Sequence, residues 1–489
     1  MALHQRIVSA PVDFGAIRSE FGLASAYPAE AGVEARDAVD AFAGSRLDRT
    51  DIALVTIDPP GAMDLDQALS IQRTRAGYLL HYAIADVAAM IRPDGALARE
   101  SGARGQTFYL PDGTVPLHPP VLSEGSASLL PGVSRPAALW TIELDEAAEP
   151  QRFSVVRATV RSVARLDYAG VQADADAGNP HPSIAALPEF GMRRIEAGLA
   201  RGAIGLRLPV QRVVRDGAAD GHWRLVVEPR TAAEDCNEQV SLLTGLCAAR
   251  IMMDGNGSGE RIGLLRTLPP PAASAIESLR RTAAALSVDW PDERTVGRVL
   301  AGLDPNSPTS LVLMSEATSL LRGANYTVLD GDGPESALRH SAIAAPYAHV
   351  TAPLRRLADR FATEICLANC AKVPVPQWVR DGLVAAAETM RRSDGVAGKV
   401  ERACVDLTEA TLLAPRTGAE FDAIVLREAN GSRPAEIFVA DPPVLAPCVG
   451  APPEGESVRV RLVSADVSTR KVSFAFPATP APDRAARLL

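Results

Sequence analysis

Residues 58–68, with the sequence DPPGAMDLDQA, place three carboxylates within nine residues on a turn that contains proline and glycine. The apolar run IALVTI at residues 52–57 comes directly before this turn and predicts a short strand. Oxygen ligands that converge from a folded turn are what a hard divalent cation requires, and carboxylates packed this tightly repel one another unless a cation lies among them. The stretch indicates a strand that leads into a metal site. A solvated acidic turn or a structural calcium loop fits the same spacing.

The regions that follow the acidic turn predict a body built from both strands and helices. Short apolar or alternating runs separated by Pro and Gly turns predict strands up to about residue 160, and helical periodicity predominates after it. We therefore expect an α+β or mixed α/β body. Strands are expected at 78–87 and 138–144, helices at 168–177, 189–202, 234–253 and in several segments from 272 to 369, and a strand hairpin at 206–227.

The two ends of the chain differ from this body. Residues 1–50 contain short amphipathic stretches, at 14–21 and 34–42, and predict a small helical segment. The helical period fades around residues 404–415, and residues 478–489 are rich in Pro, Ala and Arg and predicted to be disordered. Between the ranges 404–415 and 478–489, short strands with Gly and Pro turns predict a small β-barrel of the OB type. Its strands are expected at 420–426, 436–439, 457–462 and 471–476, interrupted by a Pro-rich stretch at 441–453.

Composition narrows the class of protein. The chain has 489 residues, of which 47% are hydrophobic and 22% charged, and this excludes a collagen, a coiled coil or a chain disordered throughout. It shows neither an apolar run long enough for a membrane span nor the layout of a signal peptide, so we expect a cytoplasmic protein. The net charge of −9 argues against a non-specific duplex binder. The six cysteines lack zinc-site spacing, which predicts reduced thiols without a disulfide partner.

A second motif, TAPLRRLAD, lies at residues 351–359. Pro353 suits a helix start, and Arg355 and Arg356 then point to different sides of the same turn. The arginine fork matches a phosphate group, and opposite a metal cluster it could neutralise charge that develops on a scissile phosphate. The alternative interpretation is that both arginines are surface or salt-bridge residues paired with Asp359.

The acidic turn resembles the motif of the ribonuclease II family, also called the RNB family, in which an Asp is followed by a second Asp six residues later and a third two residues after that. Four further stretches resemble family motifs, in the family's order. They are HYAIADV at 81–87, FYLP at 108–111 with SLLP at 128–131, Glu228-Pro229-Arg230 with Glu238, and YAHVTAPLRRLAD at 347–359. On these five ordered matches the chain is identified as a member of the family.

The resemblance implies a domain layout. After the helical segment at 1–50, it predicts a mixed α/β RNB-type catalytic domain at 51–405 and an S1-like OB-fold RNA-binding domain at 416–477. The family's usual pair of N-terminal cold-shock domains is not expected, because fifty residues are too few for two barrels. Phosphate affinity of the C-terminal barrel would come from one face, with the residues Arg459, Arg461, Arg470 and Lys471.

The resemblance also implies roles for single residues. Asp66 would position or activate the attacking water, and Arg355 would stabilise the transition state. One or two Mg²⁺ ions would be held by Asp58, Asp64, Asp66 and Gln67. The RNA would be bound by Tyr109, Tyr168, Glu238, Arg355 and Arg356, with tyrosines stacked on bases and Glu238 at the terminal sugar.

Two positions depart from the family pattern. Gln67 stands where a fourth acidic residue is usual, and its neutral amide oxygen would hold a metal more weakly. Leu206 and Leu208 stand where a second aromatic residue of the base clamp is expected, so the clamp would be one-sided.

The sequence thus predicts a magnesium-dependent enzyme that degrades single-stranded RNA, with monomers favoured. Its 3′-to-5′ direction and its nucleoside 5′-monophosphate product are implied by the resemblance. One alternative is an RNA-binding protein of the same architecture that has lost turnover, which would explain Gln67. The other is a specialised hydrolase for short oligonucleotides or one structured RNA.

Overall fold

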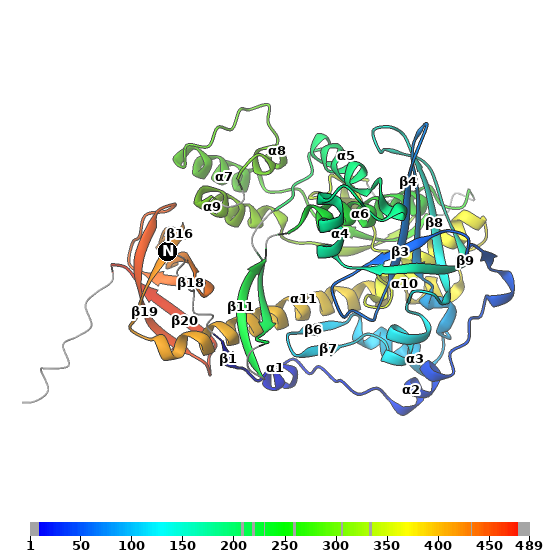
Figure 1. Ribbon diagram of the computed structural model, residues 1–489, viewed down its shortest axis with the longest axis horizontal. Coiled ribbons are helices and arrows are strands. Elements are labelled where there is room, and N and C mark those ends of the chain that lie inside the picture. The colour runs from blue at the N-terminus through cyan, green and yellow to red at the C-terminus, as the bar shows by residue number, and fades with distance from the viewer. Residues whose placement is uncertain are drawn as a thin grey trace, which may run out of the picture.

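The computed structural model describes residues 9–206, 210–217, 221–228, 230–257, 261–304, 307–331, 335–431 and 433–477. The predicted disordered tail, residues 478–489, and Leu208 lie outside the described residues. A large mixed α/β body is joined to a small β-barrel by one long helix, α11 (Gln377–Leu413) (Figure 1). The predicted fold class is therefore confirmed.

The body is organised by a six-stranded sheet with the order β2-β9-β3-β4-β5-β8. A further pairing between β8 and β9 makes the strand order return on itself, so the sheet encloses buried residues such as Tyr82 and Trp140. All four residues of β3 are buried, as expected for an apolar run that ends at the acidic turn. The strands are β2 (Leu47–Asp48), β3 (Leu54–Ile57), β4 (Gln67–Thr74), β5 (Gly77–Ala85), β8 (Ser134–Leu144) and β9 (Pro150–Leu166).

Helices pack around this sheet, and two of them position the site. Helix α6 begins with a capping box between Thr231 and Glu234, and it packs against α5 and α10. Thirteen of the fifteen residues of α10 are buried. The helices of the body are α3 (Ala96–Arg104), α4 (Tyr168–Asp176), α5 (Leu187–Ala200), α6 (Ala232–Asp254), α7 (Ala273–Ala285), α8 (Val296–Ala301), α9 (Pro308–Ala317) and α10 (Leu357–Ala371).

The start of α10 corrects the sequence prediction. The helix begins at Leu357, four residues after Pro353. The backbone of Arg356 is extended because it forms an isolated β-bridge with Gln106, and the Thr107 N–H donates to the Arg355 carbonyl. The residues before α10 therefore form a turn, in which the N–H groups of Arg355 and Arg356 donate to the Ala352 carbonyl and the Leu354 N–H donates to a side chain, Asp66.

The region from 262 to 346 contains strands that the helical pattern did not predict. Strand β12 (Ile262–Thr267) pairs in antiparallel fashion with β13 (Asn325–Asp330), which lies inside the segment predicted as helices. The β13 segment NYTVLD is six residues long and rich in β-prone residues, too short to be distinguished by period from its helical neighbours. The remaining short strands of the body are β6 (Phe108–Leu110), β7 (Gly113–Val115), β14 (Arg339–His340) and β15 (Ala345–Pro346).

The N-terminal region is only partly helical. It forms α1 (Gly15–Glu20) and α2 (Ala29–Arg36), so the helix expected at 34–42 ends at Arg36. After this helix, the Asp40 carboxylate accepts a hydrogen bond from the Arg46 guanidinium, which also forms an ion pair with the buried Asp86 of the body. Strand β1 (Ala10–Pro11) adds to the hairpin of β10 (Val210–Arg215) and β11 (His222–Glu228). Among the described residues, no helix combines the length and the apolar character needed to cross a bilayer.

Helix α11 ends at Leu413, within the range 404–415 over which the helical period fades. The helical pattern fades there because the buried face changes partners. Val400 packs in a cluster with Trp223 and Phe14, whereas Ala410 and Leu413 belong to the core of the barrel.

The barrel is closed, with the order β16-β17-β18-β20-β19. Strand β18 lies within the Pro-rich stretch that was expected to interrupt the strands. Pro443 and Pro447 are tolerated because β18 pairs with β20 only at Cys448 and Val449, so few N–H groups are needed on that side. The strands are β16 (Glu420–Arg427), β17 (Ala435–Ala440), β18 (Pro443–Val449), β19 (Ser457–Asp466) and β20 (Lys471–Ala475).

The three arginines of the face from which phosphate affinity of the barrel was expected have acidic partners. Lys471 is the exposed lysine beside them. The ion pairs are Arg459 with Asp422 at 3.1 Å, Arg461 with Glu420 at 2.9 Å and Arg470 with Glu20 at 2.7 Å. The barrel therefore offers less free positive charge to a phosphate backbone than the sequence predicted.

A buried carboxyl group links α11 to both the hairpin and the barrel. Glu409 accepts hydrogen bonds from the Gln211 side chain at 2.8 Å and the Leu445 N–H at 3.4 Å, and burial raises its pKa to about 7. The unfolded chain ionises this group at lower pH than the folded protein, so its contribution to stability falls as pH rises from about 4.5 to about 7.

We expect Glu409→Gln to stabilise the protein more at pH 8 than at pH 5, by up to about 3 kcal/mol, because glutamine keeps the acceptor and never ionises. Thermal unfolding of both proteins at the two pH values measures this difference. An equal effect of the substitution at pH 5 and pH 8 would show that Glu409 does not titrate in this window.

Candidate active site

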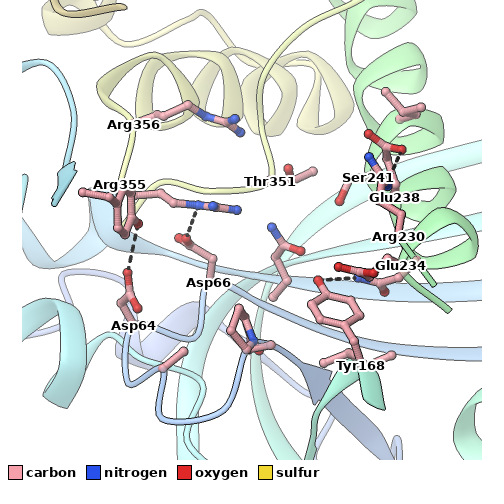
Figure 2. Close-up of a pocket in the computed structure, with 18 of the residues that line it drawn as sticks. Asp64, Asp66, Tyr168, Arg230, Glu234, Glu238, Ser241, Thr351, Arg355 and Arg356 are labelled. Carbon is pink, nitrogen blue, oxygen red and sulfur yellow. Dashed lines mark hydrogen bonds and ion pairs between the residues drawn. The ribbon is translucent and has the colours of Figure 1, made fainter. Parts of the chain in front are cut away.

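A cleft of about 530 Å³ opens where the acidic turn, the start of β4, helix α6 and the turn before α10 meet. Figure 2 shows Asp64 and Asp66 on the loop between β3 and β4, with Arg355 reaching toward them from the segment before α10. Every residue predicted for the site lines this cleft: Asp58, Asp64, Asp66, Gln67, Tyr109, Tyr168, Glu238, Arg355 and Arg356. The fold thus brings together residues that are spread over about 300 positions of the chain.

Asp66 is held from two directions in the wall of the cleft. Its Oδ1 accepts the Leu354 N–H at 2.7 Å, and its Oδ2 lies 3.2 Å from Nε of Arg355. The side chain is 4% exposed. Burial raises the pKa of Asp66 to about 8 and outweighs the opposing effects of Arg355 and the Leu354 N–H. A bound cation would favour the ionised form of such a carboxyl group.

Asp58 presents a buried oxygen with no partner. Its backbone N–H donates to the Leu166 carbonyl, which fixes the end of β3 against β9, while Oδ2 is buried and unpaired among the described residues. Burial raises the pKa of Asp58 to about 6, and the Asp64 charge adds to this effect. An unpaired buried carboxylate oxygen needs a compensating partner, and a cation is one.

The donors at this end of the cleft suit a hard cation. Asp58, Asp64 and Asp66 all offer carboxylate oxygens, which Mg²⁺ prefers. Within the part of the chain that the structure describes, no three acidic, histidine or cysteine side chains are already arranged around one point. Asp66 is instead turned to Arg355, and the Tyr109 hydroxyl lies 3.5 Å from Asp64. The chemistry of the donors and the unpaired Asp58 oxygen therefore fit Mg²⁺.

The two neighbouring arginines have different surroundings. Arg356 is held by Asp359 through two contacts of 2.9 Å, and the Ala352 N–H donates to the same carboxylate. Arg355 is 44% exposed, and its Nε lies 3.2 Å from Oδ2 of Asp66. Its half-exposed guanidinium lines the cleft, where it can donate to an anion, whereas Arg356 matches the alternative interpretation of a salt bridge with Asp359.

The opposite side of the cleft carries groups that suit a nucleoside. The Tyr168 hydroxyl accepts from Asn237 at 3.4 Å, and Glu238 pairs with Arg230 at 2.9 Å (Figure 2). Leu206 packs in the cluster of Leu279 and Leu300 and does not line the cleft. Leu206 therefore does not form a base clamp with Tyr168.

Several residues of the cleft were not predicted from the sequence. Arg230 and Thr351 belong to quoted motifs but were given no role, and the other polar residues carried no signal of their own. They are Arg212, Glu234, Asn237 and Ser241. The backbone N–H of Leu354, which holds Asp66, could not be found from residue type at all.

Family models match both parts of the chain. A model described as the RNB domain matches residues 46–367, and one described as the RNase II-type exonuclease C-terminal S1 domain matches residues 419–476. Ribonuclease R of Escherichia coli is 29% identical over 343 residues, which cover 67% of this chain and 41% of the relative. The chain thus spans about two fifths of the length of that protein.

Solved structures show the same fold. The apo form of Mycoplasma genitalium RNase R superposes with a TM-score of 0.83 at 19% identity, covering 94% of this chain and 77% of the other. A second structure of that protein is a complex with ribose methylated single-stranded RNA. Yeast Ssd1, described as a pseudonuclease, has a TM-score of 0.64 at 17% identity and covers 82% of this chain and 50% of its own.

Proposed function

Because the chain belongs to the RNB family, we propose that it is a metal-dependent exoribonuclease that digests single-stranded RNA from the 3′ end and releases nucleoside 5′-monophosphates. One observation carries this proposal: Asp58, Asp64 and Asp66 share a cleft with the half-exposed Arg355. The RNA complex of the Mycoplasma genitalium relative supports the substrate class.

The chemistry would be shared between the acidic turn and the segment before α10. Mg²⁺, when held by Asp58, Asp64 and Asp66, supplies a Lewis acid and lowers the pKa of bound water. The Leu354 N–H keeps Oδ1 of Asp66 in place, so that Oδ2 can orient the attacking water. Arg355 would then leave Oδ2 and donate from its guanidinium to the phosphate, where negative charge develops. Arg356 stays paired with Asp359 and supports this turn.

The identity of the product tests the proposed reaction. Chromatography of a complete digest of an unmodified RNA oligomer should show nucleoside 5′-monophosphates that accumulate from the first minutes. Release of 3′-monophosphates, or of fragments cut in the interior of the strand, would contradict the proposal.

The other side of the cleft is proposed to select RNA over DNA. Tyr168 would stack on the terminal nucleoside, and Glu238, held by Arg230, would accept a hydrogen bond from the 2′-hydroxyl. We expect a single 2′-deoxy substitution near the 3′ end to slow cleavage about tenfold, because a hydrogen bond to a charged group is lost.

Glu238→Ala should reduce this discrimination, while Glu238→Gln, which keeps an acceptor of the same length, should retain more of it. The measurement is the ratio of initial rates on matched oligomers. Equal rates of the unmodified protein on the ribose and deoxyribose oligomers would remove Glu238 from sugar recognition.

A second candidate function is RNA binding without turnover. Two observations favour it: Gln67 replaces the fourth acidic residue, and the fold is shared with a protein described as a pseudonuclease. The three carboxylates and Arg355 retained in the cleft weigh against this candidate, because a pure binder has no need of buried carboxyl groups with raised pKa values.

A further inference from the structure

The amide of Gln67 is part of a hydrogen-bonded chain that runs into the body. Gln67 is the first residue of β4 and pairs with Ile84 of β5, so its side chain lies on the same face as that of Tyr82, two residues before Ile84. The Tyr82 hydroxyl donates to Oε1 of Gln67 at 2.5 Å and lies 2.9 Å from Oγ of Ser241 on α6. Tyr82 is fully buried, so its position is set by the core of the sheet.

The number of available hydrogens sets the direction of this chain. A phenol has a single O–H, and Tyr82 directs it to Gln67, so Ser241 must donate to Tyr82. The amide oxygen of Gln67 therefore faces the buried tyrosine. The NH₂ end of the amide is left for the cleft, which Gln67 lines beside Asp66.

A carboxylate at this position would behave differently. An aspartate or glutamate could accept from Tyr82 with one oxygen and still offer the second oxygen to a cation. A glutamine has one oxygen only, and its second terminal atom is a donor. Glutamine side chains that face nucleic acid commonly donate to phosphate oxygens.

We propose that Gln67 is a hydrogen-bond donor to the RNA phosphate and not a metal ligand, and that Tyr82 and Ser241 hold it in this orientation. The inference rests on the proposed function in that the cleft takes RNA. It revises the assignment that the sequence indicated for Gln67, and it leaves Asp58, Asp64 and Asp66 as the metal ligands.

Two binding measurements test the proposal without relying on catalysis. RNA affinity is measured by fluorescence anisotropy of a labelled oligomer in EDTA, and Mn²⁺ affinity is measured by calorimetry without RNA. Gln67→Met, similar in length and without an amide, should weaken RNA binding about tenfold and leave Mn²⁺ affinity within about twofold. Gln67→Glu restores an acidic group, so it should strengthen Mn²⁺ binding and weaken RNA binding. Mn²⁺ affinity that falls about tenfold in Gln67→Met, with unchanged RNA affinity, would overturn the proposal.

Tyr82→Phe tests the positioning role, because it removes one hydroxyl from a buried ring. We expect the same loss of RNA affinity as in Gln67→Met, and no further loss in the double variant, because the two residues act as one unit. Thermal unfolding of each variant checks that the fold is kept. Losses that add in the double variant would remove Tyr82 from the mechanism.

The outcomes separate this inference from the proposed function. A protein that binds RNA through Gln67 but does not hydrolyse it would overturn the proposed reaction alone. A protein that hydrolyses RNA while Gln67→Met binds RNA normally would overturn the inference alone. Absence of RNA binding by the unmodified protein would overturn both.

Discussion

Asp66→Asn is expected to lower the rate of RNA hydrolysis at least about a thousandfold, the size of effect for a lost group that positions or activates a nucleophile. Asparagine has the same shape and can still accept the Leu354 N–H, but it offers no charge to a cation or to the attacking water. The rate is measured in single-turnover digestion of a labelled oligomer at saturating Mg²⁺.

The same variant should keep its fold and its affinity for RNA. Asp66 is buried and its pKa is raised to about 8, so a neutral side chain there costs little stability. Anisotropy in EDTA should give a dissociation constant within about threefold of the unmodified protein, well under the tenfold that 1.4 kcal/mol represents. A variant that retains more than about a tenth of the original rate, a barrier change under about 1.4 kcal/mol, would remove Asp66 from the mechanism.

Arg355→Ala is expected to lower the turnover rate by about 10² to 10³, with a smaller change in substrate affinity. The reason is that Arg355 is placed to meet charge that develops on the phosphate only in the transition state, so its loss affects kcat more than KM. Arg355→Lys should recover only part of the rate, because an ammonium group cannot make the two parallel bonds of a guanidinium.

Arg193 offers a matched control for this substitution. It is 44% exposed, as Arg355 is, and it pairs with a carboxylate, Glu189, but it lies on α5 and does not line the cleft. Arg193→Ala should therefore leave kcat within about twofold, since exposed ion pairs contribute little. Equal rates for the Arg355 and Arg193 variants would show that Arg355 has no special role in turnover.

The parts of the fold that the sequence predicted are those in which local pattern and tertiary environment agree. The apolar run before the acidic turn is a buried strand, and the predicted helix at 234–253 is α6, which begins with its own capping box at Thr231. The predicted site residues all line one cleft. They could be predicted together because the family resemblance covers residues far apart in the chain, which local sequence patterns do not connect.

The parts of the fold that the sequence did not predict depend on contacts with residues distant in the sequence. Arg356 is extended because Gln106 pairs with it, and this moves the start of α10 to Leu357. Strand β18 contains two prolines, which in a sequence pattern indicate a break between strands. In the closed barrel β18 pairs with β20 only at Cys448 and Val449, so the N–H groups that the prolines lack are not needed for strand pairing. Arg459 faces Asp422 through the register of β16 and β19, so this arginine of the expected basic face has an acidic partner.

Digestion of a 5′-labelled single-stranded RNA oligomer separates RNA hydrolysis from RNA binding alone, with Mg²⁺ or EDTA present and with Asp66→Asn as the matched inactive protein. We expect Mg²⁺ to support progressive shortening of the labelled strand from its 3′ end down to a short terminal product, and neither EDTA nor the Asp66 variant to support it. An oligomer that is bound but stays intact in Mg²⁺ would instead assign the protein to RNA binding without hydrolysis.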